Sequence, residues 1–264
     1  PLDGGMDSSL LDDLAHLPPE EQRRAIELLR ELERRENRQK FHNWFPDDDV
    51  VEPDGSVIYH ARAGYTKHLE HFEAGATYQQ RLFMAANRVG KTIAGSYEVA
   101  AHLTGLYKPW WPGRRWDRPV MAWVAGKSFE TTRDIVQKEL LGPVFGKGAG
   151  KAISGEGMIP GDLLGAETWR QGIANLVDTI PVRHVSGGWS LLGFKSYDQG
   201  IRAFEGTAQD VIWLDEEAPM DVYGEAMIRL MTTRGSMIST FTPLQGITDL
   251  VKQFYLPDSV PDEL

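Results

Sequence analysis

The stretch that decides the fold is RLFMAANRVGKTIAGSYEVA, residues 81–100. Its apolar start predicts a short strand over residues 82–85, and its second half predicts a helix over residues 92–104. The tripeptide Gly90-Lys91-Thr92 stands at the start of that helix, where backbone N–H groups and the helix dipole favour an anion. The usual phosphate-binding loop has glycine six residues before the lysine, whereas this chain has Ala85 there. The junction therefore predicts a phosphate loop with an altered first position.

The residue types in this loop suit a nucleotide phosphate. We expect Lys91 to contact the β- and γ-phosphates and Thr92 to offer its hydroxyl to Mg²⁺. Gly90 allows the backbone to approach closely, and the guanidinium of Arg88 is placed to reach the γ-phosphate. A chance Gly-Lys-Thr at a helix start is the alternative when the loop is taken alone. The predicted nucleotide-binding residues of the loop are Ala86, Asn87, Arg88, Val89, Gly90, Lys91 and Thr92.

Two flanking segments extend the predicted site. Upstream, Tyr78, Gln79 and Gln80 directly precede the first strand and offer an aromatic face and amide edges to an adenine. Downstream, the sequence STFTP, residues 239–243, ends a later strand. Hydroxyls at such a strand end can sense whether the γ-phosphate is present. These hydroxyls belong to Ser239, Thr240 and Thr242.

A second motif, the acidic segment VIWLDEEAP, follows the phosphate loop in the chain. It places Asp215, 124 residues after Lys91, together with Glu216 and Glu217 at the end of an apolar strand. Ligands of open α/β sheets bind at the carboxyl ends of the strands, so this triplet is expected beside the phosphate loop. We assign Asp215 to Mg²⁺ and Glu216 to the general base, with Glu217 as the alternative base. A carboxylate that polarises water favours ATP over GTP, since small GTPases use a different arrangement.

Composition restricts the class of protein. The 264 residues are 41% hydrophobic and include eight Trp, enough for the core of one large domain. There is no cysteine, which excludes disulfides and thiolate metal sites. No apolar run approaches the roughly 20 residues of a membrane span, so we expect a cytoplasmic protein without a membrane partner. The net charge of −10 argues against a broadly basic nucleic-acid coat, but it allows a local basic patch.

The chain divides into an N-terminal arm, residues 1–45, and a larger domain, residues 46–264. Residues 1–5 lack a starting Met and are expected to be an expression remnant. The arm predicts one helix ending near His16 and another beginning at Pro18-Pro19, either a solvated, salt-bridged helix or a docking arm for a partner. Residues 41–57 predict a loop or linker.

From the first strand onward, apolar strands alternate with helices, which predicts an α/β fold with a mostly parallel central sheet flanked by helices. The further expected strands are residues 120–125, 211–214 and 237–241. The further expected helices are residues 128–141, capped by Ser128, and residues 222–231. Residues 179–185 and 191–194 predict a hairpin, and the Gly-rich residues 142–175 predict a loop.

Four segments in this order, LFMAANRVGKT, FKSYDQG, FEGTAQDVIWLDEE and STFTP, resemble the ATPase half of the large terminase subunit of tailed bacteriophages. The resemblance covers about residues 58–254. Members of this family carry an altered phosphate loop with an internal arginine, which agrees with Ala85 and Arg88. The resemblance implies a RecA-like P-loop NTPase of the additional-strand, catalytic-glutamate type, with ATP and Mg²⁺ as cofactors. It also implies that residues 239–243 are a coupling motif, with Ser239, Thr240 and Thr242 as the coupling residues.

The resemblance also implies partners and a location. It implies a homo-oligomeric ring, a pentamer by expectation, that pumps double-stranded DNA through the portal protein into a procapsid, and a monomer in isolation is compatible with it. A small terminase subunit is a further implied partner. The implied location is the cytoplasm of the infected bacterial host, transiently at the procapsid portal and not in the mature virion. The nuclease domain of the family is expected to be absent from residues 1–264, so no DNA cleavage is expected from this chain.

Three points stay open at this stage. Arg202 is the first candidate for an arginine that acts on a neighbouring subunit's site, with Arg133 and Arg229 as alternatives. The segment KPWWPGRRWDRP, residues 108–119, is either a surface loop packed by its own tryptophans or a nucleic-acid contact. The competing functions are an ATP-dependent helicase or DNA remodeller, and a nucleotide-gated assembly module with little turnover. A single phosphate loop in a short chain argues against the helicase.

Overall fold

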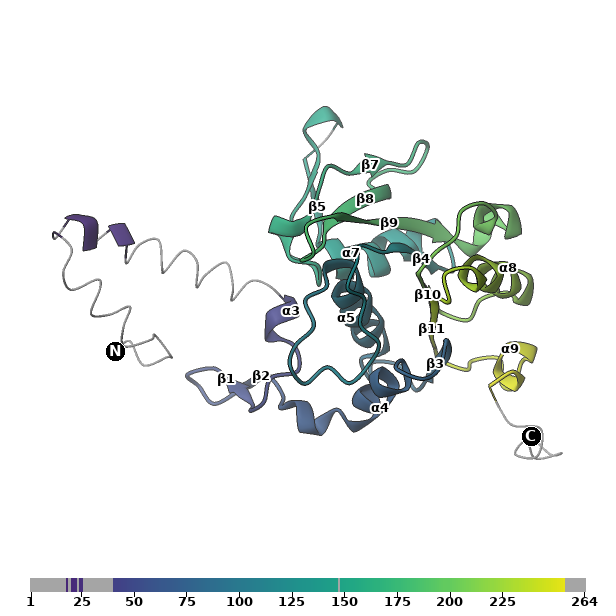
Figure 1. Cartoon of the computed structure of the whole chain (residues 1–264), viewed down its shortest axis with the longest axis horizontal. Helices are drawn as coiled ribbons and strands as arrows, with labels where there is room; N and C mark the ends of the chain where they lie inside the picture. Colours follow the sequence, from purple (N-terminus) through teal and green to yellow (C-terminus); the bar gives the residue numbers. More distant parts are fainter. Residues whose placement is uncertain (1–17, 19, 23, 26–39, 147, 255–264) are drawn as a thin grey trace.

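A computed structural model of the chain describes all residues except 1–17, 19, 23, 26–39, 147 and 255–264 (Figure 1). The first predicted N-terminal helix and most of the second therefore lie outside the described residues. A seven-stranded sheet forms the centre of the molecule, in the order β3-β11-β10-β4-β9-β8-β7. Its strands are β3 (Gln80–Met84), β4 (Met121–Gly126), β7 (Thr168–Trp169), β8 (Val177–Arg183), β9 (Trp189–Ser196), β10 (Val211–Asp215) and β11 (Ser236–Phe241).

The pairing within the sheet explains why its strands lack alternating polarity. The strands from β3 to β9 in the spatial order pair in parallel, whereas β9-β8 and β8-β7 pair in antiparallel fashion. Every residue of β10 and β11 is buried, as expected for parallel strands covered on both faces. The predicted mostly parallel sheet and the predicted hairpin, β8 with β9, are confirmed.

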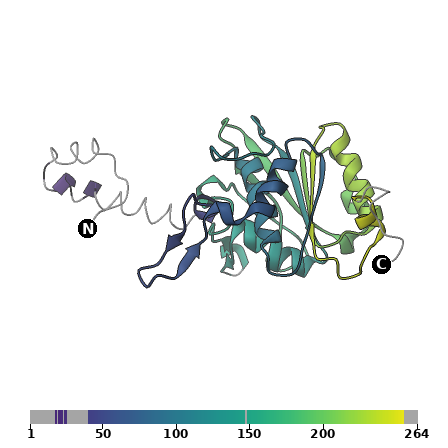
Figure 2. The ribbon, with the colours of Figure 1, turned by 90° about the horizontal axis from the view of Figure 1, so that it is seen from below.

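Helices cover both faces of the sheet (Figure 2). Helix α5 lies on one face and contacts β10 and β11, and α8 lies on the other face and contacts the same two strands. The main helices are α4 (Thr66–Ala74), α5 (Lys91–Thr104) and α8 (Met220–Met231). Shorter elements are α3 (Lys40–Asn43), α6 (Phe129–Thr131), α7 (Lys138–Leu141), α9 (Asp249–Lys252), β1 (Val50–Val51), β2 (Val57–Tyr59), β5 (Val144–Phe145) and β6 (Ala152–Ile153).

Several segments differ from the sequence prediction, and the expected loop over residues 142–175 contains the short strands β5, β6 and β7. The helix expected over residues 128–141 begins with a Ser128 capping box, as predicted, but a π-helical turn, Thr132–Gln137, separates α6 from α7. Residues 41–45, predicted to be part of a linker, are packed on the domain. Phe41 stacks on Tyr97 at 4.6 Å between ring centroids, and Phe45 meets the same ring edge-on at 5.0 Å. The burial of these two phenylalanines outweighs the polar character of their neighbours.

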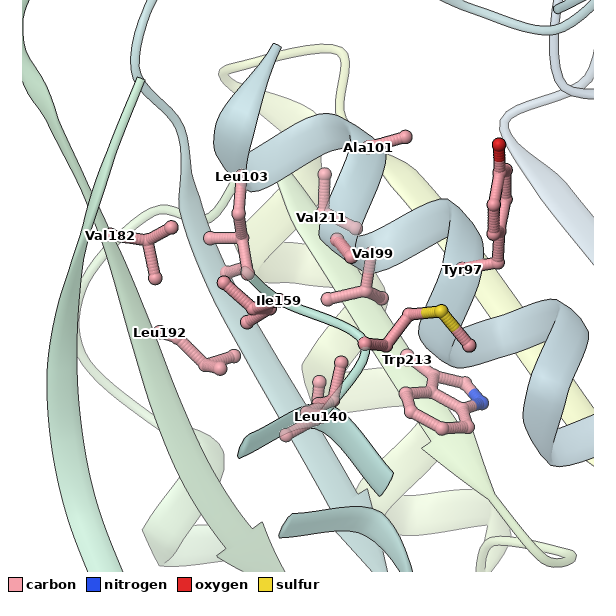
Figure 3. Packing of buried hydrophobic residues seen from close by; sticks show 14 of the residues in the cluster. Tyr97, Val99, Ala101, Leu103, Leu140, Ile159, Val182, Leu192, Val211 and Trp213 are labelled. Carbon is pink, nitrogen blue, oxygen red and sulfur yellow. The ribbon is translucent and has the colours of Figure 1, made fainter. Parts of the chain in front are cut away.

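The core on the α5 face is centred on Trp213 of β10 (Figure 3). Val99 and Leu103 of α5 pack in the same cluster, together with Leu192 of β9. The indole of Trp213 is fully buried, and its Nε1 donates a hydrogen bond to Thr240 Oγ1 at 2.7 Å. Since a buried indole N–H needs an acceptor, this bond ties the core of the domain to the end of β11.

Close contact between α5 and this indole leads to a first prediction. A Cβ atom on Gly95 would lie 2.3 Å from Trp213 Cε2, so Gly95→Ala must displace the indole or the helix. We expect the free energy of unfolding, measured by urea denaturation, to fall by about 1–3 kcal/mol, the usual cost of overpacking.

Gly224 of α8 provides a matched control, because a Cβ atom there meets no atom within 4 Å. Gly224→Ala should be neutral or stabilise by up to about 1 kcal/mol, the gain in helix propensity. Equal effects of the two substitutions would contradict the packing of Trp213 against Gly95.

Candidate functional site

The predicted phosphate loop, residues 85–90, connects the end of β3 to the first residue of α5. Arg88 and Gly90 adopt left-handed backbone conformations, with φ of 62° and 83°. Gly90 is the N-cap of α5 and provides no side-chain cap, so the first turn of the helix keeps its N–H groups for another acceptor. A Cβ atom on Gly90 would also lie 2.9 Å from His68 Nε2. Both conformation and space therefore require glycine here.

The two cations of the loop lie in different surroundings. Lys91 is buried, and its Nζ donates to the carbonyl of Ala86 at 2.6 Å, across the loop. Arg88 is exposed, and its guanidinium makes no hydrogen bond or ion pair with any residue that the structure describes. Lys91 is thus held in place by the loop, whereas the side chain of Arg88 remains available to a ligand.

The acidic motif lies beside this loop. Thr240 donates a hydrogen bond to Asp215 Oδ1 at 2.8 Å, and Thr92 donates to the same oxygen at 3.5 Å. Burial raises the pKa of Asp215 to about 7, and the charge of Glu216 adds to this effect, while the Thr240 hydroxyl and Lys91 oppose it. A buried carboxylate beside a threonine hydroxyl provides the oxygen ligands that Mg²⁺ prefers.

Glu216 and Glu217 have different environments. Glu216 adopts a left-handed conformation with φ of 67°, and its N–H donates to the carbonyl of Thr240 at 2.8 Å. The hydroxyl of Tyr197 lies 2.9 Å and 3.0 Å from the carbonyls of Asp215 and Glu216 and holds this strained turn. Glu217 instead accepts a hydrogen bond from the Thr248 hydroxyl. The carboxylate of Glu217 is therefore held by Thr248, whereas the carboxylate of Glu216 makes no hydrogen bond or ion pair with the described residues.

A cavity of about 600 Å³ joins the phosphate loop to the acidic strand end. Its volume lies in the range of small-molecule sites. Glu216 is among the lining residues and Glu217 is not, which favours Glu216 as the candidate base. The lining residues are Trp44, Phe45, Tyr65, His68, Asn87, Arg88, Val89, Gly90, Lys91, Thr92, Ile93, Asp215 and Glu216.

Five of these lining residues, Trp44, Phe45, Tyr65, His68 and Ile93, were missed by the sequence analysis. Ile93 directly follows the loop, whereas Trp44, Phe45 and Tyr65 come from the segment between α3 and α4, and His68 from the first turn of α4, all before the first strand of the main sheet. The aromatic content of residues 41–65 was a signal, but only contacts distant in sequence show that it borders the loop. Burial lowers the pKa of His68, so its imidazole is neutral near pH 7.

The predicted adenine contacts do not line this cavity, and their role stays a prediction. Tyr78, Gln79 and Gln80 stand at the start of β3, and the phosphate loop follows the other end of this strand. Five strand residues at about 3.3 Å each separate the two ends by roughly 16 Å. Gln80 Oε1 accepts a hydrogen bond from the hydroxyl of Tyr223 at 2.6 Å, and Tyr78 is exposed. None of the three lines the cavity described above, but Tyr78 and Gln80 line a neighbouring cavity of about 670 Å³ that also reaches Ala85 and Val89 of the loop.

The predicted coupling segment is divided between two contacts. Thr240 binds Asp215 as described above, and Thr242 donates to Asn87 Oδ1 of the phosphate loop at 2.7 Å. Ser239 is buried, and its hydroxyl has no hydrogen-bond partner among the described residues. The end of β11 therefore touches both halves of the candidate site.

The three candidate arginines differ in whether their guanidinium groups are already paired within the chain. Arg133 pairs with Asp134 at 2.7 Å, and Arg229 pairs with Glu225 at 2.8 Å. Arg202 is exposed in the 3₁₀ turn Ile201–Phe204, does not line the cavity, and makes no side-chain bond with the described part of the chain. Of the three, Arg202 is the one left available to another molecule.

The segment 108–119 is packed by its own tryptophans. Trp111 and Trp116 are buried, and the guanidinium of Arg114 lies 4.0 Å from the ring centre of Trp116. Arg118 forms an ion pair with Asp210 at 2.7 Å. The structure thus agrees with the interpretation of a self-packed surface loop. No helix of the described residues is long and apolar enough to cross a membrane.

A parallel sheet with a Gly-Lys-Thr loop and an acidic strand end at its carboxyl edge has the layout of an α/β phosphate-binding domain. Comparison with known proteins identifies the family within this class. Residues 82–258 match the family model described as terminase large subunit, T4likevirus-type, N-terminal, and the chain belongs to this family.

The chain is also similar to individual terminases. It is 34% identical over 261 residues to the terminase large subunit of Salmonella phage P22, covering 91% of this chain and 47% of that protein, so it spans about half the length of this relative. The large terminase ATPase domain of Thermus phage P74-26 has a TM-score of 0.46 at 16% identity, covering 68% of this chain and 69% of that one. The large terminase of bacteriophage HK97 has a TM-score of 0.42 at 12% identity, covering 75% and 36%.

Proposed function

We propose that this chain is a RecA-like ATPase domain that drives double-stranded viral DNA into a preformed capsid. The observation that carries the proposal is that the hydroxyls of Thr92 and Thr240 both donate to the carboxylate of Asp215, beside the phosphate loop. Membership of the terminase large subunit family supports the proposal that the energy of ATP hydrolysis is used to move DNA.

In this proposal the loop binds the triphosphate. The N–H groups at the start of α5 and the ammonium of Lys91 contact the β- and γ-phosphates, and Arg88 reaches the γ-phosphate. Thr92 and Asp215 would hold Mg²⁺, which neutralises charge that develops on the phosphates. A magnesium site built with substrate phosphates needs only one or two protein carboxylates. This explains why no cluster of three acidic or histidine ligands is needed, and none occurs in the described part of the chain.

Glu216 is the proposed general base. It lines the cavity, and its backbone is fixed by Thr240 and Tyr197, so a water molecule next to the γ-phosphate would meet a carboxylate on a fixed turn. We further propose that the base of the nucleotide stacks near Tyr65 and Trp44, since these aromatic side chains border the cavity.

We assign the coupling between ATP hydrolysis and DNA movement to the end of β11. Thr242 is hydrogen bonded to Asn87 of the loop and Thr240 to Asp215, so a change at the γ-phosphate would reach β11 through two bonds. Arg202, which has no side-chain partner in the described residues, is proposed to complete the site of a neighbouring subunit in a ring. The portal protein, a small terminase subunit and the host cytoplasm are proposed partners and location on the same family basis.

Steady-state ATP hydrolysis measured over a range of protein concentrations, with and without duplex DNA, tests the function. We expect turnover to rise more steeply than linearly with concentration, because an arginine from a neighbour completes the site, and to rise further with duplex DNA. Arg202→Ala should remove the concentration dependence, whereas Arg133→Ala, whose side chain is already paired, should retain it. ATP binding without turnover under every condition would favour a nucleotide-gated assembly module, and single-stranded DNA as the better activator would favour a helicase.

A further inference from the structure

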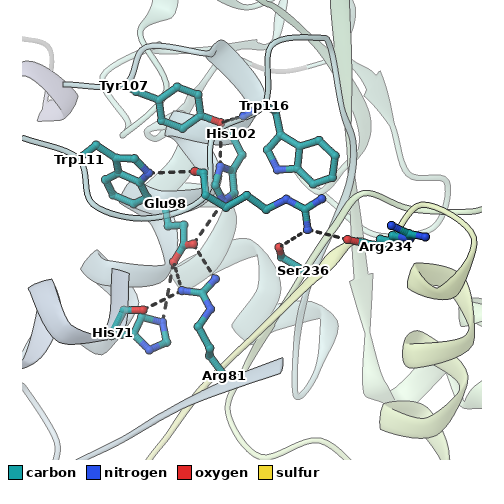
Figure 4. Close-up of polar contacts among 10 residues, drawn as sticks. His71, Arg81, Glu98, His102, Tyr107, Trp111, Trp116, Arg234 and Ser236 are labelled. Carbon is teal, nitrogen blue, oxygen red and sulfur yellow. Dashed lines mark hydrogen bonds and ion pairs between the residues drawn. The ribbon is translucent and has the colours of Figure 1, made fainter. Parts of the chain in front are cut away.

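A buried charge network lies behind the phosphate loop (Figure 4). Arg81 of β3 forms two hydrogen bonds with Glu98 of α5, Nη2 to Oε1 at 2.6 Å and Nη1 to Oε2 at 3.0 Å. Arg81 Nη1 also donates to the carbonyl of His71 on α4 at 2.9 Å. His102 Nε2 lies 3.2 Å from Glu98 Oε1. Three elements therefore meet at one carboxylate, and nothing in the proposed chemistry uses it.

The network holds one charge pair in a dry environment. Glu98 and His102 are fully buried, and Arg81 is 4% exposed. Burial alone would raise the pKa of Glu98, but Arg81 and His102 lower it well below its ordinary value, so the carboxylate stays ionised. Burial lowers the pKa of His71 to about 4, so this imidazole is neutral at pH 7. Because an ionised carboxylate only accepts, His102 donates from Nε2, and its Nδ1 accepts from the hydroxyl of Tyr107 at 3.0 Å.

The position of this pair in the chain connects it to the loop. Arg81 lies three residues before the end of β3, and Glu98 lies seven residues after the start of α5, with the loop between these two ends. The bidentate pair therefore fixes the distance and the rotation of α5 relative to β3. These two quantities set where the loop N–H groups and Lys91 stand. A planar guanidinium bound through two parallel hydrogen bonds has little freedom to rotate, which suits this role.

The network also reaches the segment that follows α5. The hydroxyl of Tyr107 accepts a hydrogen bond from the N–H of Trp116 at 2.8 Å, within the tryptophan-packed loop. Arg114 of this loop donates to the carbonyl of Arg234 at 2.5 Å, just before β11 begins. The network therefore contacts β3 directly and reaches the start of β11 through the tryptophan-packed loop, and β3 and β11 are two of the three strands that end at the candidate site.

We infer that Arg81 and Glu98 are a positioning pair that holds the phosphate loop in its nucleotide-binding arrangement, an inference that rests on the proposed function. Neither side chain lines the cavity, so both act through the loop. Loss of the pair should weaken ATP binding by relaxing the loop. It should leave the chemical step at saturating ATP much less affected, because Glu216 follows β10, which is outside the network.

The test separates binding from folding. Single removal of either charge leaves its partner buried and unpaired, so the informative variant is the double substitution Arg81→Leu with Glu98→Leu, which removes both charges; such replacements often preserve stability. We expect it to unfold as a single cooperative transition near the native Tm. Its Kd for a fluorescent ATP analogue should be raised about 10-fold, and kcat at saturating ATP should stay within about threefold. Arg81→Lys keeps the charge but loses the two-pronged geometry, and a smaller rise in Kd, about threefold, is expected.

Arg118→Lys is the matched control for Arg81→Lys, because Arg118 also makes a bidentate pair, with Asp210, but at the amino ends of β4 and β10. Its Kd for the ATP analogue should remain native. Native Kd values in the double variant and in Arg81→Lys would overturn the inference and leave the proposed function intact. If the unaltered chain fails to bind the analogue, the proposed function fails and the inference falls with it.

Discussion

Glu216→Gln is expected to lower kcat for ATP hydrolysis by about 10²–10⁴-fold, the usual contribution of a positioned general base. The amide keeps the shape of the side chain and cannot accept a proton, so the Kd for ATP should stay within about threefold of the native value. The physical basis is the turn after β10, where Thr240 and Tyr197 hold the backbone of Glu216 in its left-handed conformation. Single-turnover hydrolysis and equilibrium binding measure the two quantities separately.

Glu217→Gln is the control for this substitution. Glu217 is bonded to Thr248, the N-cap of α9, so its loss should reduce stability slightly and leave kcat within a few-fold. If Glu217→Gln abolished turnover and Glu216→Gln retained it, the assignment of the base would be reversed.

Lys91→Ala is expected to weaken ATP binding by about 10²-fold or more. A charge-assisted hydrogen bond contributes about 1.5–3 kcal/mol, or roughly 10- to 150-fold each, and Lys91 is expected to contact two phosphates. The structure adds a second reason. Lys91 Nζ donates to the carbonyl of Ala86, so its removal also loosens the loop that provides the N–H groups. Isothermal titration with ATP and Mg²⁺ measures the loss.

Lys67→Ala controls for the loss of one positive charge from the same side of the protein. Lys67 is exposed on α4 and paired with Glu70 at 2.7 Å, so its removal should leave ATP affinity unchanged. Native affinity in Lys91→Ala would mean that the phosphates bind elsewhere. The second cation of the loop, Arg88, would then be the first residue to test.

The local structure of the chain could be predicted from its sequence. The strand and helix on either side of the phosphate loop, the acidic end of β10 and the β8-β9 hairpin all follow from short patterns of apolar, glycine and acidic residues. Such patterns report how neighbouring residues share one strand or one helix, and this information lies within about ten residues. The mostly parallel sheet followed too, because strands buried on both faces have no polar alternation.

Contacts between segments that are distant in the chain could not be predicted from these short patterns. The sequence offered Tyr78 to Gln80 as the base contacts because they are close to the loop in the chain, but they stand at the other end of β3 and do not line the cavity beside Asp215. Trp44 and Tyr65, farther away in the chain, line the cavity instead. Distance along the chain is a poor guide to distance in space once a strand lies between two segments.

The sequence by itself determined that a phosphate loop and an acidic strand end exist, because each motif is continuous and its residue types suit one chemistry. Only the tertiary structure decided how they are completed. It distinguishes Glu216 from Glu217 through the Thr248 hydrogen bond, joins Thr242 to Asn87, and places Arg81 against Glu98 behind the loop. The physical reason is that a side-chain hydrogen bond depends on distance and angle to within a few tenths of an ångström, and packing of the whole chain sets both.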